Sequence, residues 1–226
     1  TAVILCGGKG SRLKPLTNKT PKPLIKINGE EILSYIIKHI LSYNVENLLI
    51  LTGYKQKKIK KFIKKKFKKN KNLNILNTGL NTDIIHRIQK GKKYYNDYLL
   101  ICYGDTLVDL NINFLLKEHF RNKANITISI YNPKINFGIV TMDKANNLIS
   151  FLEKPNLNHW INIGFIIISK ENFFQISKKY QSFKFFLENL ANFNKVKTFK
   201  HFGNHITVNT LNELDEAKKN IKKFKI

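Results

Sequence analysis

A segment rich in glycines and cations follows the first apolar run of this 226-residue chain. Residues 5–23 read LCGGKGSRLKPLTNKTPKP and begin where the apolar run 2–5 ends. Glycine permits positive φ and lets backbone N–H groups approach an anion, so such a loop can form a concave nest of donors. Arginine and lysine add charge for phosphate oxygens, and arginine can bind two oxygens at once. The segment therefore predicts a site for a nucleoside triphosphate. Its glycines are Gly7, Gly8 and Gly10, and its cations are Lys9, Arg12, Lys14, Lys19 and Lys22.

Two familiar phosphate-binding motifs do not describe this segment. A Walker loop needs Ser or Thr after GxxxxGK, and the dinucleotide fingerprint needs a third glycine where this chain has Leu13. The alternative is a plain glycine-rich turn in a lysine-rich protein. Cations on both sides of the turn, together with the prolines Pro21 and Pro23, favour phosphate binding.

An aspartate follows a second apolar run. Residues 98–103 are mostly apolar and are followed by Gly104 and Asp105. Mg²⁺ prefers one or two carboxylates together with phosphate oxygens, so Asp105 is the predicted magnesium ligand. An aspartate after a glycine is also a common turn former, and the phosphate loop upstream favours the metal role.

The elements that must position these residues alternate between strand and helix. Because ligands bind at the carboxyl ends of strands in such folds, the glycine loop and Asp105 should share one edge of the sheet. We expect a single α/β domain over 1–226, built on one doubly wound, mostly parallel, Rossmann-like sheet. The strand-rich second half should extend this sheet and supply the acceptor side of the cleft. Expected strands cover 2–5, 48–51, 73–76, 98–103, 126–131, 138–142, 148–152 and 164–169, and expected helices cover 32–43, 55–71, 84–95 and 211–222.

The formal net charge of +25 is extreme and by itself suggests a nucleic acid or an anionic membrane as partner. In the densest lysine run, residues 55–71, apolar residues recur at helical spacing, which predicts an amphipathic helix whose lysines face solvent. No nucleic-acid-binding module is legible. We therefore expect neither nucleic acid nor membrane as partner, and a basic nucleic-acid binder is the least favoured alternative.

The cysteines and the hydropathy pattern point to an intracellular enzyme. No apolar run approaches the ~20 residues of a membrane span, and no signal peptide precedes the first strand. Cys6 and Cys102 both lie in expected core strands, where free thiols are commoner than disulfides, and no zinc-type spacing is present. We expect a cytoplasmic location.

Several motifs along the chain resemble those of one enzyme family. GGKGSRLKPLTNKTPKPLIKINGEEIL at 7–33 is similar to the opening signature of the sugar-1-phosphate nucleotidylyltransferases. TGYK at 52–55, CYGD at 102–105, FG at 137–138, FLEKP at 151–155 and INIGF at 161–165 follow in the family's order. The glucose-1-phosphate cytidylyltransferases are the most similar branch, judged from NTGLNT at 77–82, a following arginine and YGDTLVDLNI at 103–112. The resemblance covers nearly the whole chain.

The resemblance implies a reaction and a set of site residues. An NTP, with CTP as first candidate, would react with a sugar 1-phosphate to give an NDP-sugar and pyrophosphate with the help of Mg²⁺, as a step of nucleotide-sugar and polysaccharide biosynthesis. Arg12, Lys22 and Asp105 would be catalytic, and Asp105 and Asn209 would hold the metal. The nucleotide would contact Leu5, Cys6, Gly7, Gly8, Gly10, Ser11, Arg12, Lys22, Thr78, Gly79, Thr82, Arg87 and Gly104. The sugar phosphate would contact Phe137, Gly138, Glu153, Lys154, Asn162 and Gly164.

Each acceptor residue also has a plainer interpretation. Glu153 and Lys154 could be a pair at a hairpin edge, and Asn162 and Gly164 could form a β-bulge. Trp160 should pack beside the acceptor pocket. The histidines His86, His201 and His205 show no partner pattern for acid–base work and are expected on the surface or in packing positions.

Two departures from the family pattern leave the substrates open. The cytidylyltransferases carry a second TGGR where this chain has the residues 84–87, Ile-Ile-His-Arg, so only Arg87 matches. The family places a second metal-binding Asp where this chain has Asn209, whose neutral amide oxygen is a weaker ligand. GTP, UTP or dTTP, another phosphorylated acceptor, or a catalytically weak nucleotide-binding homologue are therefore alternatives. Family members are often oligomeric, and a homo-oligomer is an open expectation.

Overall fold

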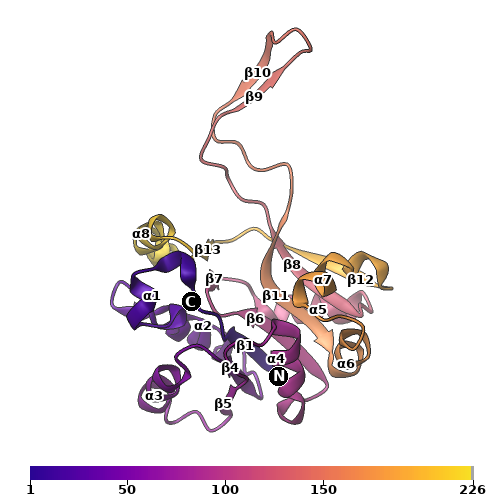
Figure 1. Cartoon of the computed structure of the whole chain (residues 1–226). Helices are drawn as coiled ribbons and strands as arrows, with labels where there is room; N and C mark the ends of the chain where they lie inside the picture. The colour runs from indigo at the N-terminus through magenta and orange to yellow at the C-terminus, as the bar shows by residue number, and fades with distance from the viewer. Residues whose placement is uncertain (225–226) are drawn as a thin grey trace.

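The centre of the molecule is a seven-stranded sheet with strand order β12-β8-β11-β6-β1-β4-β5. The computed structural model of the protein describes residues 1–224, so the domain predicted over 1–226 extends beyond the described part. Figure 1 shows the sheet running through the body of the molecule. Its strands are β1 (Ala2–Cys6), β4 (Leu48–Thr52), β5 (Leu73–Asn77), β6 (Tyr98–Tyr103), β8 (Ile126–Tyr131), β11 (Ile161–Ser169) and β12 (Val196–His201).

Most neighbouring strands in this sheet are parallel. β1 runs parallel to both β4 and β6, and β5 continues the parallel arrangement beyond β4. β11 runs antiparallel to β6 and β8, and β12 is again parallel to β8. The predicted α/β fold with a mostly parallel sheet is confirmed. The carboxyl ends of β1 and β6 lie next to each other, at the edge where such sheets bind ligands.

The sheet is buried between two apolar layers. Along β1, Ala2, Ile4 and Cys6 belong to one buried cluster and Val3 belongs to the other, because successive side chains of a strand point to opposite faces. One cluster includes residues of α2, α3, α5 and α8, and the other includes residues of α4, α6 and α7. The helices are α1 (Leu16–Lys19), α2 (Ile32–Leu41), α3 (Gln56–Lys66), α4 (Ile84–Lys90), α5 (Ile112–Arg121), α6 (Lys170–Ser177), α7 (Phe183–Glu188) and α8 (Leu211–Asn220).

Helix boundaries differ from the expected ones where the backbone changes conformation. α3 begins only after Lys55, which has a positive φ of 50°. α4 ends at Lys90, and Gly91 and a 3₁₀ turn follow it. The helices α1, α5, α6 and α7 were not among the expected elements.

Three small two-stranded sheets complete the strand arrangement. β2 (Lys26–Ile27) pairs with β3 (Glu30–Glu31), and β9 (Ile139–Met142) pairs with β10 (Leu148–Leu152). β7 (Thr106–Val108) pairs with β13 (His205–Thr207). The β7–β13 pair matters for the site, because it brings the segment after Asp105 beside the segment before Asn209.

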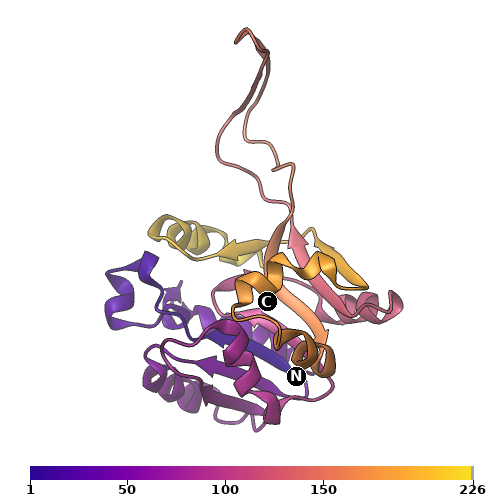
Figure 2. The same cartoon turned by 45° about the vertical axis from the view of Figure 1, so that its right-hand side comes forward.

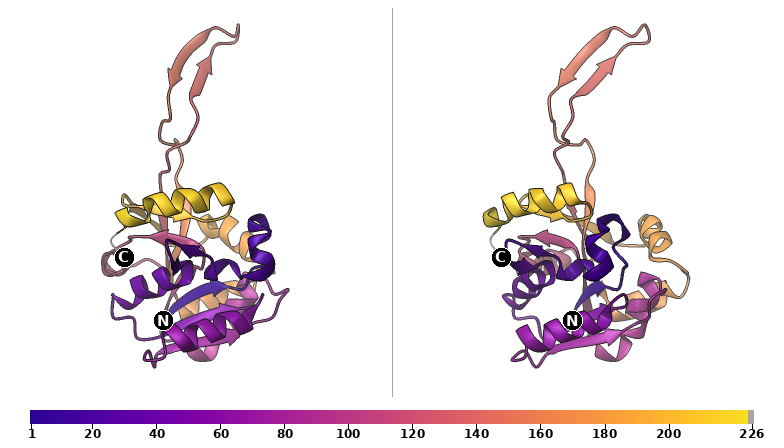
Figure 3. Two further views of the ribbon diagram at one scale, coloured as in Figure 1. Left: turned by 90° about the vertical axis from the view of Figure 1, so that its left-hand side faces the viewer. Right: turned by 60° about the vertical axis from the view of Figure 1, so that its left-hand side comes forward.

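The expectation that residues 138–142 and 148–152 extend the main sheet is wrong. They form the separate hairpin β9–β10 at the tip of an excursion that stands away from the body, as Figures 1 and 2 and both views of Figure 3 show. We call residues 133–160 the arm. Its two strands pair with each other because the Asp143 carboxylate closes a short turn, accepting hydrogen bonds from the backbone N–H groups of Ala145 and Asn147. The prolines Pro133 and Pro155 lack N–H groups, which disfavours continuation of a central strand.

Two other expectations can be compared with the described residues. Cys6 and Cys102 are buried free thiols, as expected. Among residues 1–224, no helix combines the length and the apolar character that crossing a membrane requires.

Candidate active site

A cleft of about 670 Å³ opens at the carboxyl ends of β1 and β6. The glycine loop forms one wall, and residues that follow β6 form another. Most of the predicted nucleotide and metal residues therefore share one site. Of the predicted residues, the cleft is lined by Leu5, Cys6, Gly7, Gly8, Gly10, Ser11, Arg12, Lys22, Thr82, Arg87, Gly104, Asp105 and Asn209.

The glycine loop is built for close approach. Gly10 has a φ of 63°, and a Cβ added to it would lie 3.0 Å from Cβ of Lys22. Its carbonyl oxygen accepts a hydrogen bond from the Thr17 hydroxyl at 3.0 Å, which holds the turn against the next helix. A Cβ at Gly8 would meet no atom within 4 Å, so the backbone there is open toward the cleft. The loop is fixed at one glycine and accessible at the other.

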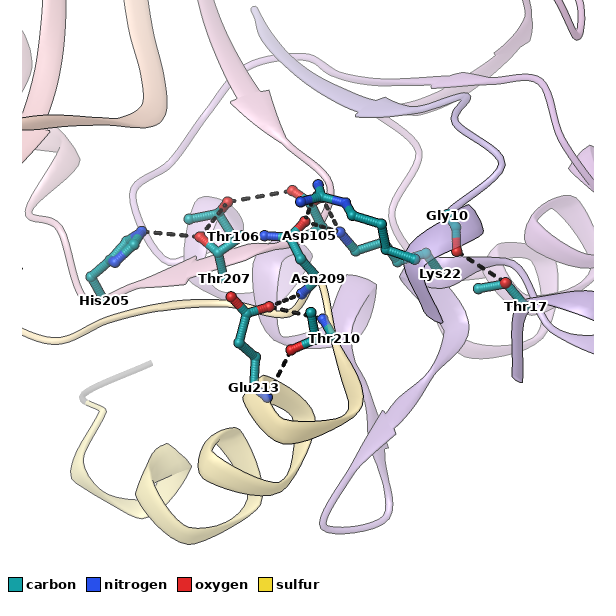
Figure 4. A network of polar contacts seen from close by, with 11 residues as sticks. Gly10, Thr17, Lys22, Asp105, Thr106, His205, Thr207, Asn209, Thr210 and Glu213 are labelled. Carbon is teal, nitrogen blue, oxygen red and sulfur yellow. Dashed lines mark hydrogen bonds and ion pairs between the residues drawn. The ribbon is translucent and has the colours of Figure 1, made fainter. Parts of the chain in front are cut away.

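Two cations and two oxygen-bearing side chains meet beside this loop. The Lys22 ammonium forms an ion pair with the Asp105 carboxylate and donates to Oδ1 of Asn209 at 2.9 Å. Arg12 Nη2 donates to the same amide oxygen at 2.8 Å. Figure 4 shows Lys22, Asp105 and Asn209 pointing toward one another from different parts of the chain. Lys22 is buried, so its ammonium is held in place at this position rather than moving freely in solvent.

Asn209 is held by the start of the last long helix. The Thr210 hydroxyl accepts a hydrogen bond from the backbone N–H of Glu213, and the Glu213 carboxylate accepts from the backbone N–H groups of Thr210 and Asn209 (Figure 4). This reciprocal capping box fixes the chain where α8 begins. The backbone N–H of Val208 donates to the carbonyl of Asp105 at 3.2 Å, which ties the two metal candidates together.

A row of polar side chains lies behind Asp105. The hydroxyls of Thr106 and Thr207 lie 3.3 Å apart across the β7–β13 pair, and Nε2 of His205 lies 3.1 Å from the Thr207 hydroxyl (Figure 4). Burial, and after it the charge of His201, lower the pKa of His205 to about 4, so the imidazole is neutral at pH 7. Nε2 of His201 lies 3.2 Å from a carboxylate oxygen of Asp109. The expected packing role of both histidines is borne out, but each has a polar partner that the sequence did not indicate.

Arg87 lies beneath the glycine loop. Its guanidinium is buried and donates to the Thr78 hydroxyl at 2.7 Å and to the carbonyls of Gly79 at 2.7 Å and Leu80 at 3.1 Å. A Cβ on Gly7 would lie 2.3 Å from the guanidinium carbon, which explains the glycine at that position. Burial lowers the pKa of Arg87, but an arginine keeps its proton at physiological pH. Arg87 thus links separate loops and adds positive charge to the floor of the cleft.

The predicted base-side residues divide into two groups. Thr82 lines the cleft, whereas Thr78 is buried and its hydroxyl donates to the carbonyl of Thr52 at 2.8 Å. Gly79 has a φ of 98° and shapes the turn without lining the cleft. Some residues that line the cleft were not predicted from the sequence. They stand next to or near predicted residues in the chain, and this was the signal that could have found them. The missed residues are Pro23, Leu80, Asp83, Ile84 and Tyr103, whereas Lys9, expected for its charge, lines the cleft as well.

Asn162 and Gly164 lie behind the missed residue Tyr103. The Asn162 amide donates to the Tyr103 hydroxyl at 3.2 Å, and a Cβ on Gly164 would lie 2.3 Å from the tyrosine ring. The register of β11 shifts between Asn162 and Ile166, so the β-bulge considered as the plainer interpretation is present. The two residues support a wall of the cleft through Tyr103 and do not line it themselves.

The remaining acceptor candidates are not in the cleft. Phe137, Gly138, Glu153 and Lys154 all fall within residues 133–160 and so lie on the arm. Glu153 and Lys154 pair with each other at 3.6 Å, and both side chains are exposed, as in the alternative hairpin-edge interpretation. Trp160 lies at the root of the arm against the ring of Phe202, and it does not line the cleft.

The donor set suits a magnesium ion that is shared with a triphosphate. In residues 1–224, no cluster of three or more His, Cys, Asp and Glu side chains is arranged to hold a metal alone. Asp105 and Asn209 nevertheless direct a carboxylate and an amide oxygen at one cationic position, where the Lys22 ammonium lies. Because Mg²⁺ commonly binds one or two carboxylates and takes its other ligands from phosphates and water, these residues fit it.

Comparison with known proteins agrees with the fold. The family model described as nucleotidyl transferase matches residues 1–220, and the chain belongs to this family of enzymes. The Bacillus subtilis (strain 168) protein named probable glucose-1-phosphate cytidylyltransferase is 32% identical over 243 residues, covering 96% of this chain and 94% of that protein.

A second relative and a solved structure extend this comparison. The D-glycero-alpha-D-manno-heptose 1-phosphate guanylyltransferase of Campylobacter jejuni is 29% identical, covering 87% of each chain. The crystal structure of HddC from Yersinia pseudotuberculosis has the same fold, with a TM-score of 0.74, 23% identity and coverage of 97% of this chain and 98% of that one.

Proposed function

We propose that this enzyme transfers the nucleotidyl group of an NTP, with CTP as first candidate, to a sugar 1-phosphate and releases pyrophosphate. The observation that carries the proposal is the meeting of Lys22, Arg12, Asp105 and Asn209 beside the glycine loop. The reaction joins two anions, and their charge repulsion is the main obstacle that the enzyme must overcome. Two cations, together with two oxygen atoms that can hold a metal ion, supply the positive charge that this reaction needs.

In this proposal the glycine loop and Arg12 bind the β- and γ-phosphates. A phosphate oxygen of the sugar 1-phosphate attacks the α-phosphorus, the bond between that phosphorus and the bridging oxygen breaks, and pyrophosphate leaves. Lys22 stabilises the negative charge that develops at the α-phosphate. Asp105 and Asn209 would hold Mg²⁺, whose bound form neutralises charge on the triphosphate.

The acceptor would be recognised by residues outside the cleft wall. Lys154 would neutralise the phosphate of the sugar, and Glu153 would accept hydrogen bonds from sugar hydroxyls. Phe137 and Gly138 would contact the sugar beside them. Asn162 and Gly164 would act through Tyr103, whose ring they support.

Two relatives bear on which base the enzyme uses. The relative named a cytidylyltransferase covers nearly the whole chain and favours CTP. The relative named a guanylyltransferase keeps GTP and a different sugar as an alternative, and UTP or dTTP would use the same chemistry. Asn209, in place of the expected carboxylate, favours a second candidate, a nucleotide-binding homologue with weak turnover.

Pyrophosphate release tests this function directly. Each NTP is incubated with Mg²⁺ and a panel of sugar 1-phosphates, and we expect release that needs both substrates and is fastest with CTP. Nucleotide binding by calorimetry without any release would favour the weak homologue. Absence of both binding and release would contradict the proposal. Cys6 and Cys102 are free thiols, which supports the expected cytoplasmic location.

A further inference from the structure

Three polar side chains lie on one face of the β7–β13 pair. Thr207 lies directly opposite Thr106 in the antiparallel register, and His205 precedes Thr207 by two residues. Side chains alternate along a strand, and directly opposite residues point the same way, so these three side chains share a face. We call them the polar row. Thr106 follows Asp105 in the chain, so the row begins beside the carboxylate that is proposed to bind the metal.

Hydrogen-bonding contacts connect the polar row to Asp105 (Figure 4). Thr106 Oγ1 donates to Oδ1 of Asp105 at 3.4 Å, and the hydroxyls of Thr106 and Thr207 lie 3.3 Å apart. Nε2 of His205 lies 3.1 Å from the Thr207 hydroxyl at the far end of the row. The other oxygen of Asp105, Oδ2, pairs with Lys22 in the cleft. The two carboxylate oxygens thus have separate partners, one in the row and one in the cleft.

The carboxylate fixes the direction of every hydrogen bond in the row. An ionised carboxylate only accepts, so Thr106 must give its single hydroxyl proton to Asp105. The contact between the two threonines then uses the hydroxyl proton of Thr207. Because Thr207 has no second hydroxyl proton, Nε2 of His205 must donate the last hydrogen bond. The row therefore requires the tautomer of His205 that carries its proton on Nε2.

The same row controls how the carboxylate of Asp105 is rotated. The last torsion of an aspartate side chain has a broad range, so its carboxylate turns easily unless its oxygens are held. Thr106 does not line the cleft, and it holds Oδ1 on its own side, which leaves Oδ2 facing the Lys22 ammonium. A proton on Nδ1 of His205 would instead draw the Thr207 proton toward Nε2. The two threonine oxygens would then face each other with no proton between them.

We propose that Thr106, Thr207 and His205 are positioning residues for the metal, and that His205 donates through the two hydroxyls to hold Asp105 in the rotation that binds Mg²⁺. This inference rests on the proposed function, since it takes Asp105 as a magnesium ligand. Carboxylates that bind metals are commonly held by hydrogen bonds from such outer partners. The His205 ring lies 5.0 Å from the ring of Tyr131, which supports it at the end of the row.

Two variants of Thr207 with nearly the same shape test the row. Thr207→Val has no hydroxyl, whereas Thr207→Ser keeps it. The magnesium concentration for half-maximal pyrophosphate release should rise about tenfold in Thr207→Val and stay near the unsubstituted value in Thr207→Ser. Saturating magnesium should restore most of kcat in Thr207→Val, because Lys22 and Arg12 are intact. Calorimetry of NTP binding at several magnesium concentrations, without acceptor, should show the same order.

Variants of His205 test the end of the row in the same way. His205→Phe keeps an aromatic ring beside Tyr131 but has no donor, and it should raise the magnesium requirement several-fold. His205→Gln keeps an N–H donor and should raise the requirement less. Equal requirements in these two variants and the unsubstituted protein would overturn the role of His205.

The matched control is Thr127→Val, which removes a buried hydroxyl that lies 2.7 Å from Nδ1 of His119 and does not line the cleft. It should lower thermal stability but leave the magnesium requirement unchanged. An unchanged requirement in Thr207→Val, or an equal rise in Thr127→Val, would overturn the positioning role, provided that the unsubstituted enzyme is active. An unsubstituted enzyme that neither binds nucleotide nor releases pyrophosphate would instead remove the proposed function, and the metal role of the row with it.

Nitrogen-15 NMR of the histidine rings tests the direction of the row without reference to activity or metal. At neutral pH, Nε2 of His205 should carry the proton and Nδ1 should not, and the loss of the signals in His205→Gln assigns them. The Nε2 proton should be visible directly, because a hydrogen-bonded N–H exchanges slowly with water. In Thr207→Val this proton signal should disappear. A proton on Nδ1 in the unsubstituted protein, or an Nε2 proton that is unaffected in Thr207→Val, would overturn the proposal.

Discussion

The cleft and the arm hold their residues in opposite ways. In the cleft, side chains from distant segments fix one another: Lys22 and Arg12 share the amide oxygen of Asn209, and Arg87 donates to several loops. On the arm, polar contacts are local and the large apolar side chains face outward. Preorganised groups lower the cost of binding, and the residues proposed to bind the nucleotide are already held in place by one another. The residues proposed to bind the acceptor are not.

Substitution of Lys22 should have the largest effect on activity, because this residue contacts both Asp105 and Asn209 in the cleft. Lys22→Ala should lower kcat roughly 10²–10³-fold, because it removes a buried cation from the position where phosphate charge develops. Pyrophosphate release at saturating substrates measures this effect. Lys19→Ala is the matched control and should stay near the unsubstituted rate, because Lys19, although counted among the cations of the loop in the sequence, is exposed and does not line the cleft. Similar rates for the two variants would contradict the role of Lys22.

Substitution of Arg87 should show that the residues of the cleft also stabilise the fold. Arg87→Met should lower the free energy of unfolding by about 2–4 kcal/mol, because the buried Thr78 hydroxyl and the partly buried carbonyls of Gly79 and Leu80 lose their donor. Urea unfolding measures the change. The control is Arg121→Met, at an exposed arginine that pairs with the Glu118 carboxylate, where we expect a change within about 0.5 kcal/mol. Equal stability of both variants would mean that the loops hold their positions without Arg87.

Much of the cleft could be predicted from the sequence because its parts follow simple rules. Apolar runs marked β1 and β6 to within one residue, and parallel strands bring the residues that follow them to one edge. The glycine loop and Asp105 therefore had to lie close together. The approach of Asn209 could be inferred only from the family resemblance, because it depends on the pairing of β7 with β13 across a long stretch of chain.

The arm could not be predicted, for a physical reason. Two short apolar strands joined by a turn can either pair with each other as a separate hairpin or join the main sheet. The sequence of residues 138–152 is compatible with both arrangements. Arg87 posed a similar problem, since its partners are carbonyls of loops that the fold alone brings together. The partner of His201 was missed because Asp109 lies far from it in the sequence.

His205 lies where the two regions join, against the ring of Tyr131 at the end of β8, and it makes this junction sensitive to pH. Its folded pKa of about 4 lies below the ordinary value of 6.5, so the unfolded chain binds the proton more readily. The stabilisation is present above pH 6.5 and is lost as the pH falls toward 4. The loss should be about 1–3 kcal/mol, allowing for partial exposure.

Urea unfolding between pH 7 and pH 4 measures this dependence. The variant His205→Gln keeps a polar group but cannot titrate in this range, so its stability should decline less steeply than that of the unsubstituted chain. Histidines that do not interact with His205 contribute equally to both proteins, so the difference reports His205 together with its coupling to His201. Parallel curves for the two proteins would show that this imidazole is not held neutral by the fold.

Asn209 allows a finer test of the cation position. Asn209→Asp adds a second carboxylate beside Asp105, and the magnesium concentration for half-maximal activity should fall several-fold, by up to about tenfold. The change is limited because Lys22 and Arg12, which already contact this side chain, would also bind the new carboxylate. Asn209→Ala should raise the magnesium requirement instead. The same requirement in all three proteins would argue against Asn209 as a ligand.

The smallest expected effect separates the two regions most cleanly. Lys154→Ala should change the dissociation constant of the NTP by less than about twofold, measured by calorimetry without acceptor, because Lys154 does not line the cleft. The same variant should raise KM for the sugar 1-phosphate, since its ammonium is proposed to bind that phosphate. Lys144→Ala, at an exposed lysine in the arm's turn, should change neither quantity. A large loss of NTP affinity in Lys154→Ala would mean that the arm contacts the triphosphate as well. The division between a finished nucleotide half and a separate acceptor half would then have to be abandoned.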